Sequence, residues 1–285
     1  MANILSIQSH VSYGYVGNRV ATFALQRLGH EVITINTVQF SNHTGYGQWQ
    51  GDIFSKEHIE SVWQSIKQRV KIENIDALLT GYLGDVQLGK LAKSIAHEIK
   101  ESNPDALYCL DPVFGDVGRG IFAKQDLADF FRDTLIHYAS LLTPNHFEFD
   151  YITRRQNRTI KELSLAAQMM FQSGTKAILI TSYQGDEIRP DEIGMVVLMP
   201  TEKWLVKTPR ITFTTPPNGS GDLVSSLLLD KWLKKLSAKD ALAQVTEQIY
   251  AVFSKTKSLN QRELAIIQSQ TVFDQQNSQF IPVMA

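Results

Sequence analysis

The sequence predicts an α/β fold in which a mainly parallel central sheet is flanked by helices. Short apolar runs alternate along the chain with longer segments whose apolar residues recur at helical spacing. Strands that alternate with helices form βαβ units, which build a parallel sheet covered on both faces. Polar residues follow directly after most of the apolar runs, where open α/β sheets bind their ligands.

Six short apolar runs are the expected strands of this sheet. They are Ile4–Gln8, Glu31–Asn36, Ala77–Thr80, Leu107–Leu110, Leu141–Thr143 and Ala177–Thr181. Amphipathic segments between them predict helices at Tyr15–Leu28, Lys56–Val70, Asp85–Lys100 and Ile160–Gln172. The runs Met195–Met199 and Lys203–Lys207 are separated by a short turn that begins with Pro200, and they predict an antiparallel hairpin at the sheet edge.

The C-terminal part of the chain is predicted to be mostly helical from Gly221 to about Lys257. Apolar residues recur there at every fourth position: Val224, Leu228, Trp232 and Leu236. Leu264–Ser269 predicts a last strand or a helix turn, and the polar tail Asp274–Ala285 is expected to be loose. Because no repeat or linker interrupts the pattern, residues 1–285 are expected to form one domain.

The balance of charge and the single cysteine exclude several classes of protein. The chain has 285 residues with 28 basic and 29 acidic side chains, which gives no excess charge for nucleic acid or an acidic membrane. Its apolar runs are too short to span a bilayer. Cys109 is the only cysteine, which excludes an intrachain disulfide and fits a reducing compartment. We therefore expect a cytoplasmic protein that binds neither nucleic acid nor membrane.

A glycine-rich turn precedes the expected C-terminal helix and carries a carboxylate: Gly219-Ser220-Gly221-Asp222. Backbone N–H groups at a helix start lack intrahelical partners and attract anions. Asp222 would then lie beside a phosphate site, as a kinase of small alcohols requires for its base. The alternative is a tight turn in which Asp222 only complements the helix dipole. These residues alone leave both interpretations open.

Two further acidic residues follow expected strands. Asp111 comes directly after one strand and before Pro112, where a carboxylate can hold Mg²⁺ or its waters against a triphosphate. An Asx turn is the alternative at Asp111. Glu148 lies three residues after Asn145, which predicts a capping box at a helix start. Glu148 can also be a second acidic group near the metal, and the two roles are compatible.

Two loops have the composition of ligand-binding segments. Gly115–Gly120 is glycine-rich with one cation, Arg119, and is interpreted as a flap over phosphates or as a plain surface loop. Phe40–Gly47 mixes aromatic, amide, imidazole and hydroxyl groups without a regular pattern, which suits a planar polar ring. An ordinary structural loop is the alternative there. The chain has neither a Walker-type phosphate loop nor a zinc-binding pattern.

Several motifs, taken together, resemble a known family. Asn218-Gly219-Ser220-Gly221-Asp222 resembles the C-terminal signature of the ribokinase superfamily. Within that superfamily, five segments resemble pyridoxal kinases, in the same order along the chain: Ser6–Gly14, Asn36–Thr44, Gly81–Gly84, Asp111–Asp116 and Thr143–Glu148. The first two are specific to the pyridoxal branch. The resemblance extends to about Thr256 and implies a ribokinase-like three-layer sandwich.

The resemblance implies ATP-dependent phosphorylation of the 5′-hydroxyl of pyridoxal, with Mg²⁺ and a monovalent cation such as K⁺. Asp222 would be the base, and the N–H groups of Gly219, Ser220 and Gly221 would hold the developing charge. The implied vitamin-site residues are Ser9, His43, Thr44, Gly45, Tyr82 and Asp222. The implied nucleotide-side residues are Asp111, Thr143, Glu148, Thr181, Lys207, Thr208, Pro209 and Arg210, with Asp111 and Glu148 serving the metal. A homodimer is expected in the same way.

Two departures from the family pattern keep other functions open. Thr181-Ser182 stands where pyridoxal kinases often carry a lysine, as in many sugar kinases of the superfamily, and Ser220 stands where threonine or valine is common. A related kinase acting on a hydroxymethylpyrimidine or a sugar is therefore the main alternative. A third hypothesis is a vitamin B6 carrier that transfers nothing, against which Asp222 and its flanking glycines argue.

Overall fold

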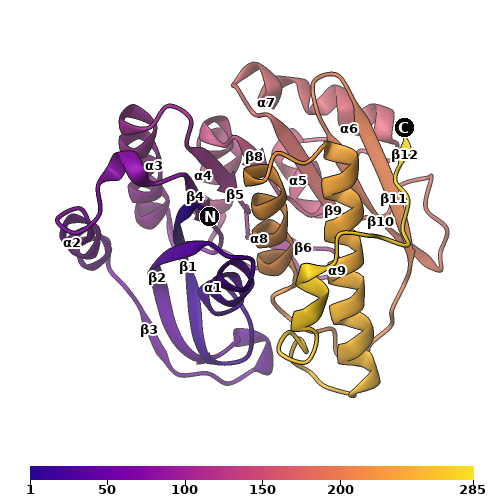
Figure 1. Ribbon diagram of the computed structural model, residues 1–285, viewed down its shortest axis with the longest axis horizontal. Coiled ribbons are helices and arrows are strands. Elements are labelled where there is room, and N and C mark those ends of the chain that lie inside the picture. The colour runs from indigo at the N-terminus through magenta and orange to yellow at the C-terminus, as the bar shows by residue number, and fades with distance from the viewer.

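A computed structural model describes all residues 1–285, and its strands and helices lie as follows (Figure 1). The strands are β1 (Asn3–Tyr13), β2 (Glu31–Asn42), β3 (Gly51–Ile53), β4 (Ala77–Thr80), β5 (Leu107–Leu110), β6 (Gly115–Asp116), β7 (Gly120–Ile121), β8 (Leu141–Leu142), β9 (Ala177–Tyr183), β10 (Glu192–Leu198), β11 (Lys203–Pro209) and β12 (Val283–Met284). The α-helices are α1 (Asn18–Arg27), α2 (Lys56–Ile66), α3 (Val86–Ser102), α4 (Gln125–Asp133), α5 (His146–Thr153), α6 (Ile160–Ala166), α7 (Gln168–Gln172), α8 (Ser220–Leu233) and α9 (Ala238–Ser258). Short 3₁₀ helices are η1 (Thr44–Tyr46), η2 (Ile72–Asn74), η3 (Leu135–Tyr138) and η4 (Gln270–Asp274).

Ten strands form the central sheet, in the order β12-β11-β10-β9-β8-β5-β4-β1-β2-β3. The six strands from β9 to β2 in this order are parallel, as the alternation of strands and helices predicts. The edges are antiparallel, because the expected β10–β11 hairpin joins one side and β3 joins the other. A small separate hairpin pairs β6 with β7.

Helices cover both faces of the sheet and bury two hydrophobic clusters (Figure 1). The larger cluster packs α2 to α7 against one face, and the smaller packs α1, α8 and α9 against the other. Successive strand residues serve opposite faces, so in β1 Leu5 belongs to the first cluster and Ile4 to the second. The predicted three layers are therefore present, with burial of each large apolar side chain contributing about 1.5–3 kcal/mol.

Several of the expected elements have different bounds. Strands β1 and β2 continue to Tyr13 and Asn42, so the first part of Phe40–Gly47 is strand rather than irregular loop. The two extensions pair with each other beyond a register shift near His10, and their Val11, Val38 and Phe40 form a small buried cluster with Val16. The segment Ile160–Gln172 is two helices, α6 and α7, with Ala167 between them.

The C-terminal segment Asp274–Ala285 was expected to be loose, and this expectation was wrong for its last residues. Strand β12 pairs with the edge strand β11, whose unpaired backbone groups would otherwise face solvent. Phe280 packs edge-on against Tyr250 of α9, with ring centroids 4.8 Å apart. Leu264–Ser269 forms turns that lead into η4, and it is not a strand. No helix of the structure has the length and apolar character needed to cross a membrane.

Candidate active site

A cavity of about 1410 Å³ opens at the carboxyl ends of the parallel strands. All but one of the predicted site residues line it: Ser9, His43, Thr44, Gly45, Tyr82, Asp111, Thr143, Glu148, Thr181, Thr208, Pro209, Arg210, Gly219, Ser220, Gly221 and Asp222. Pockets for one small ligand typically hold about 300–1,000 Å³. The cavity therefore has room for two substrates side by side.

The exception is Lys207, which the structure does not bring into the cavity. Alternate residues of a strand face opposite sides, and Val206 and Thr208 of β11 are the ones that line the cavity. The amine of Lys207 donates a hydrogen bond to the carbonyl of Glu187 instead. The expectation that Lys207 contacts nucleotide therefore does not agree with its position.

The glycine-rich turn ends at the N-terminus of α8, as predicted. Gly219 is the N-cap residue with φ +90°, and a Cβ there would lie 1.8 Å from the carbonyl oxygen of Tyr15. Only glycine fits both the left-handed backbone and this contact. The helix begins at Ser220, so the N–H groups of Ser220, Gly221 and Asp222 have no intrahelical acceptor. This first turn lines the cavity and can bind an anion.

Asp222 lies in this same first turn, and its carboxylate has one protein donor. The backbone N–H of Gly17 donates to Asp222 Oδ2 over 2.8 Å. Burial raises the pKa of Asp222 above its ordinary value, and the hydrogen bond from Gly17 opposes this shift only in part. Asp222 is therefore a better proton acceptor than a solvated aspartate.

Asp111 is buried beside the start of α8 with an oxygen that has no partner. Asp111 is 3% exposed, and its Oδ2 makes no hydrogen bond. A Cβ on Gly221 would lie 3.3 Å from this oxygen, so Asp111 faces the first turn of α8. Burial, and then the charges of Glu148 and Asp222, raise the pKa of Asp111 well above its usual range. The carboxylates of Asp111, Glu148 and Asp222 therefore lie close enough to repel one another.

Glu148 forms the predicted capping box and also holds the base of the β6–β7 hairpin. Asn145 Oδ1 accepts from the Glu148 N–H, and Glu148 Oε2 accepts from the Asn145 N–H, each over 2.9 Å. Glu148 Oε1 accepts from the N–H groups of Phe114 (3.1 Å) and Gly115 (3.3 Å), at the base of the β6–β7 hairpin. Burial raises the pKa of Glu148 to about 8, although these three hydrogen bonds oppose the shift.

The acidic cluster fits a magnesium ion that is brought by a nucleotide. No group of three metal-ligating side chains converges on one point in the structure. Mg²⁺ commonly keeps several waters and takes one or two carboxylates together with substrate phosphates. The unpartnered Asp111 oxygen supplies such a carboxylate, and Glu148 lines the same cavity.

The pKa of His43, on the predicted vitamin side of the cavity, is strongly shifted. Its Nδ1 accepts a hydrogen bond from the Gly45 N–H over 3.0 Å, so a neutral His43 ring carries its proton on Nε2. Burial, with the positive charges of Arg119 and Arg262, lowers the pKa of His43 to about 4. At neutral pH His43 therefore presents an uncharged N–H donor to a ring ligand.

Comparison with known proteins assigns the chain to a family. The model of the phosphomethylpyrimidine kinase family matches residues 20–266. The chain is 40% identical over 281 residues to pyridoxal kinase PdxY of Corynebacterium diphtheriae, with 98% of each chain covered. The chain belongs to the pyridoxal kinase family. It is also 38% identical over 275 residues to pyridoxal kinase PdxY of Granulibacter bethesdensis, with 95% of this chain and 96% of that one covered.

A solved structure confirms the ribokinase-like α/β fold of this kinase. Pyridoxal kinase from Leishmania donovani, in complex with ADP and pyridoxamine, is similar with a TM-score of 0.90 at 25% identity, and the whole of each chain is covered. That protein binds a nucleotide and a vitamin B6 form together. Its arrangement agrees with a cavity that has room for two ligands.

Sequence reasoning missed a hydrogen-bond partner of Asp222 and one wall of the kinase's cavity. Gly17, which donates to Asp222, lies 205 residues away along the chain, and only its glycine identity at a helix start gave a signal. The other missed part is one face of α9, which adds Thr246, Ile249, Tyr250 and Phe253 to the wall beside β11. In the sequence these residues indicate only an amphipathic helix. The pattern does not predict which part of the protein the apolar face packs against.

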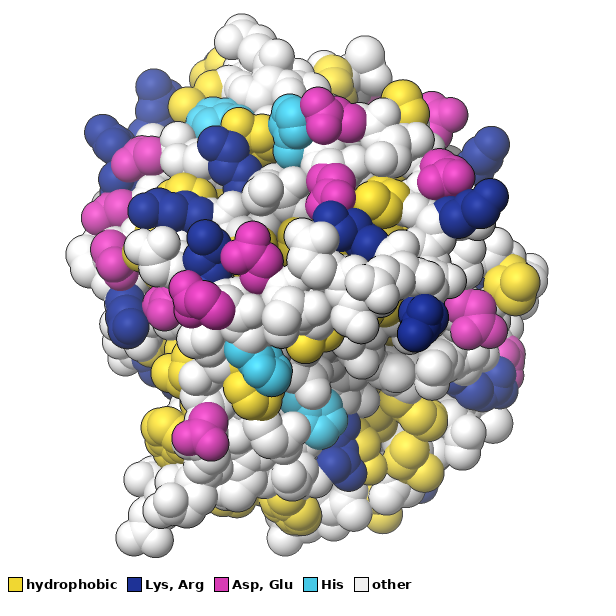
Figure 2. All heavy atoms as spheres, turned by 90° about the vertical axis from the view of Figure 1, so that its left-hand side faces the viewer, with side chains coloured by type: hydrophobic (Ala, Val, Ile, Leu, Met, Phe, Trp, Pro, Cys, Tyr) yellow, Lys and Arg dark blue, Asp and Glu magenta, His cyan; other side chains and the backbone are white.

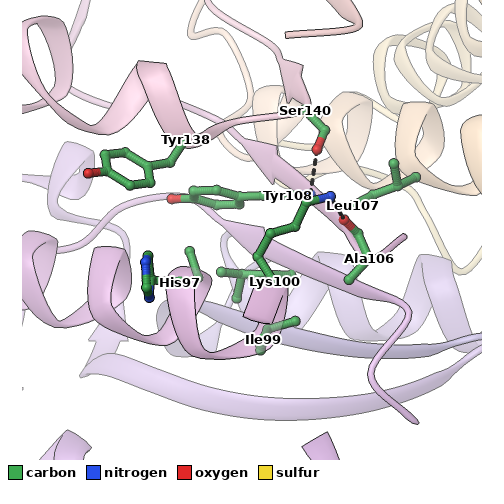
Figure 3. Close-up of a pocket in the computed structure, with 10 residues that line it drawn as sticks. His97, Ile99, Lys100, Ala106, Leu107, Tyr108, Tyr138 and Ser140 are labelled. Carbon is green, nitrogen blue, oxygen red and sulfur yellow. Dashed lines mark hydrogen bonds between the residues drawn. The ribbon is translucent and has the colours of Figure 1, made fainter. Parts of the chain in front are cut away.

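A second, much smaller cavity lies near the opposite end of the kinase's sheet (Figure 3). It measures about 80 Å³ and is lined mainly by apolar atoms between α3 and the start of β5. Lys100 Nζ donates to the Ala106 carbonyl over 3.1 Å, and Ser140 Oγ accepts from the Tyr108 N–H over 3.2 Å. Since one water takes about 30 Å³, this space holds a few waters and no substrate.

Proposed function

We propose that the chain transfers the terminal phosphoryl group of ATP to the 5′-hydroxyl of pyridoxal. The observation that carries this proposal is the first turn of α8, where the Asp222 carboxylate lies beside unpaired backbone N–H groups. A base and a set of anion donors at one point are what transfer to an alcohol requires. Relatives named pyridoxal kinase support pyridoxal as the alcohol.

Asp222 acts in this proposal as the base, and the N–H groups of the glycine-rich turn hold developing negative charge. Phosphoryl transfer passes through a loose transition state, so the base accepts the hydroxyl proton late. The raised pKa of Asp222 supports this role, because the carboxylate is a stronger base than a solvated aspartate. The N–H groups at Gly219, Ser220 and Gly221 need no reorganisation as charge develops.

The two sides of the cavity would hold the two substrates. We assign Ser9, His43, Thr44, Gly45 and Tyr82 to the pyridine ring, with the Nε2–H of His43 as a donor toward it. We assign Thr143, Thr181, Thr208, Pro209 and Arg210 to the nucleotide. The complex of the Leishmania donovani kinase with ADP and pyridoxamine supports two adjacent ligand sites.

Asp111 and Glu148 are the residues that would hold Mg²⁺ near the phosphates. When bound, Mg²⁺ neutralises and aligns the phosphate oxygens. The raised pKa values of Asp111 and Glu148 mark a site where a cation would relieve the cost of burying carboxylates. The use of K⁺ is proposed only on the resemblance to the family, and it is tested directly below.

The experiment is a coupled assay of ATP consumption with pyridoxal, pyridoxine, pyridoxamine and hydroxymethylpyrimidine. Each substrate is measured with Mg²⁺, with and without K⁺, and with EDTA as the metal-free control. We expect fast turnover with pyridoxal that is lost in EDTA. Turnover with another alcohol but not pyridoxal would contradict the substrate assignment, while consumption with none of them would contradict the proposed reaction.

Phosphorylation of a hydroxymethylpyrimidine is the second candidate function. The match to the phosphomethylpyrimidine kinase family and the presence of Thr181 in place of the lysine favour it. Phosphorylation of a sugar is supported only by Thr181. A carrier without transfer is disfavoured, because a binding protein has no use for Asp222 beside unpaired N–H groups.

We also propose that residues 1–285 form one kinase domain, and that it works as a cytoplasmic homodimer. Strand β3 is an open sheet edge. Its last residue, Ile53, is 47% exposed, and Trp49 just before the strand is 39% exposed. Figure 2 shows this side of the molecule, where hydrophobic and His side chains lie among the charged ones from top to bottom. Open edges and exposed apolar side chains favour self-association. Light scattering should give twice the 32.1 kDa chain mass.

A further inference from the structure

We propose that Arg262 and Glu263, in the segment after α9, are positioning residues that hold the vitamin-side loop His43–Gly47 in place over the cavity. The inference rests on the assignment of that loop to the pyridine ring. Neither residue lines the cavity, and no motif singles them out. Figure 1 shows the segment after α9 passing close to the end of β2 and η1 at the lower side of the molecule.

Glu263 connects two segments that are far apart in the sequence. Its Oε1 accepts a hydrogen bond from the hydroxyl of Tyr46 in η1 over 2.6 Å. Its Oε2 accepts from the backbone N–H of Tyr15 over 3.0 Å. Burial and the neighbouring Glu263 carboxylate raise the pKa of Tyr46, so its hydroxyl stays a donor. Both oxygens of one carboxylate are thus used to join η1 to the turn after β1.

Arg262 holds the same short helix from its other side. Its Nη2 donates to the carbonyl oxygen of Gly45 over 2.6 Å. Its guanidinium lies over the ring of Tyr46, 3.5 Å from the centroid. A planar guanidinium can stack and donate at once, which lysine cannot reproduce. Arg262 and Glu263 therefore fix both the backbone and the aromatic side chain of η1.

The turn that Glu263 reaches also contacts the catalytic end of α8. Gly14 has φ +99°, and a Cβ there would lie 2.4 Å from Glu263 Oε2, so the carboxylate approaches only because this residue is glycine. Further along the same turn, the carbonyl of Tyr15 packs on Gly219 and the N–H of Gly17 donates to Asp222. Glu263 therefore ties the ring-binding loop to the turn that orients the base.

His43 is the ring-facing residue on which this arrangement acts. It precedes η1 and accepts from the N–H of Gly45, whose carbonyl is the acceptor for Arg262. The charge of Arg262 is one of the causes that lower the pKa of His43. Loosening Arg262 should thus change both the position of His43 and its protonation.

The kinetic test compares Glu263→Gln and Arg262→Met with the wild type. Gln261→Ala is the matched control, because Gln261 is exposed, directly precedes Arg262 and makes no side-chain hydrogen bond to the loop. We expect the KM for pyridoxal to rise about tenfold in both variants, as for loss of one charge-assisted hydrogen bond. The KM for ATP should stay within about twofold of the wild type. Equal rises in both KM values, or none, would overturn the proposal.

Two further measurements separate positioning from a general loss of structure. Tyr46→Phe keeps the ring and removes the hydroxyl, so its effect on the KM for pyridoxal should not add to that of Glu263→Gln. Additive effects would show that the two groups act independently, against the proposal. If stacking and donation are both needed, Arg262→Lys should raise the KM for pyridoxal as much as Arg262→Met does. A wild-type KM in Arg262→Lys would show that only the positive charge matters, against the proposal.

A readout without turnover keeps this inference distinct from the proposed function. In an NMR titration, the pKa of His43 should be about 4 in the wild type and higher in Arg262→Met, with Gln261→Ala unchanged. If the chain does not phosphorylate pyridoxal but the His43 shift appears, the proposed function fails and the positioning role stands. If pyridoxal is phosphorylated and the His43 pKa is the same in all three proteins, the positioning role fails alone.

Discussion

Helix α8 carries two aspartates at its two ends, and their surroundings are opposite. Asp230 near the C-terminal end is fully buried and contacts His30 Nε2 (2.9 Å), Lys231 Nζ (2.8 Å) and Lys234 Nζ (2.6 Å). Asp222 at the N-terminal end accepts one hydrogen bond, from the backbone N–H of Gly17. Burial alone would raise the pKa of Asp230, but these three partners lower it to about 2, whereas burial raises the pKa of Asp222.

The difference is the one expected between a structural carboxylate and a catalytic one, which is the role proposed for Asp222. A buried charge is tolerated where the protein supplies its partners, as at Asp230. Asp222, Asp111 and Glu148 instead have raised pKa values and face the cavity. None of these three carboxylates forms an ion pair with a Lys or Arg side chain. A substrate proton or a metal ion can balance their charge, which is typical of active sites. One helix thus has its stabilising ion pairs at one end and its proposed chemistry at the other.

Asp222→Asn should have the largest effect on activity. Removal of the general base should lower kcat about 10²–10⁴-fold. The midpoint of thermal unfolding should stay the same or rise, because a poorly paired, half-buried charge is lost. The coupled assay and a thermal melt measure the two quantities on one preparation. Near-normal turnover would contradict the assignment of Asp222 as the base.

Asp230→Asn, the same change at the other end of α8, should act on stability instead. Breaking the buried pairs leaves Lys231 without its partner and should cost about 3–5 kcal/mol in the free energy of unfolding. Chemical denaturation measures this loss, and kcat per folded molecule should be close to the wild-type value. A loss of kcat with unchanged stability would mean that the two ends of the helix are not separable.

The acidic cluster at the cavity, through Glu148, and the C-terminal end of α8, through Asp230, should also respond to pH in opposite directions. The folded pKa of Glu148 is raised from 4.5 to about 8, so the folded state binds its proton more tightly and the free energy of unfolding falls as pH rises between those values. The folded pKa of Asp230 is lowered from 3.8 to about 2, so its stabilisation is present above 3.8 and is lost as pH falls toward 2.

Denaturation curves over a pH series, for the wild type, Glu148→Gln and Asp230→Asn, test this contrast. The fall in stability above pH 4.5 should be smaller in Glu148→Gln, and the loss toward acid pH should be smaller in Asp230→Asn. If Mg²⁺ binds the acidic cluster, adding it should stabilise the wild type more at the alkaline end of the series. Parallel curves for all three proteins would remove the electrostatic basis of the comparison.

Lys207→Ala should have the smallest effect on activity. It allows the same comparison between a paired side chain and one that faces the cavity to be made for two cations, Lys207 and Arg210. The amine of Lys207 is paired with the Glu187 carbonyl away from the cavity, whereas Arg210 lines it. The KM for ATP should therefore change less than about twofold in Lys207→Ala and should rise in Arg210→Ala. A larger effect at Lys207 would restore the sequence-based assignment and require β11 to present its other face to the nucleotide.

Most of the fold and many of the site residues could be predicted because their signals are local. The alternation of strands and helices, the hairpin at Pro200 and the capping box at Asn145 each lie within a few residues. The edge strand β12 was missed, because two residues in a polar tail carry no period and pair only since β11 leaves an open edge. Lys207 was misplaced because a motif gives the strand but not which face of it meets the cavity.

The sequence by itself determined the layered α/β architecture and the glycine-rich start of α8, since helix starts and strand patterns depend on neighbouring residues. Only the tertiary structure decided which side chains remain unpaired. Gly17 meets Asp222 across 205 residues, His30 meets Asp230 across 200, and Tyr46 meets Glu263 across 217. Each contact is created by the packing of α1, α8 and the segment after α9 around β1 and β2. Whether a carboxylate is structural or reactive depends on such partners, which no local pattern contains.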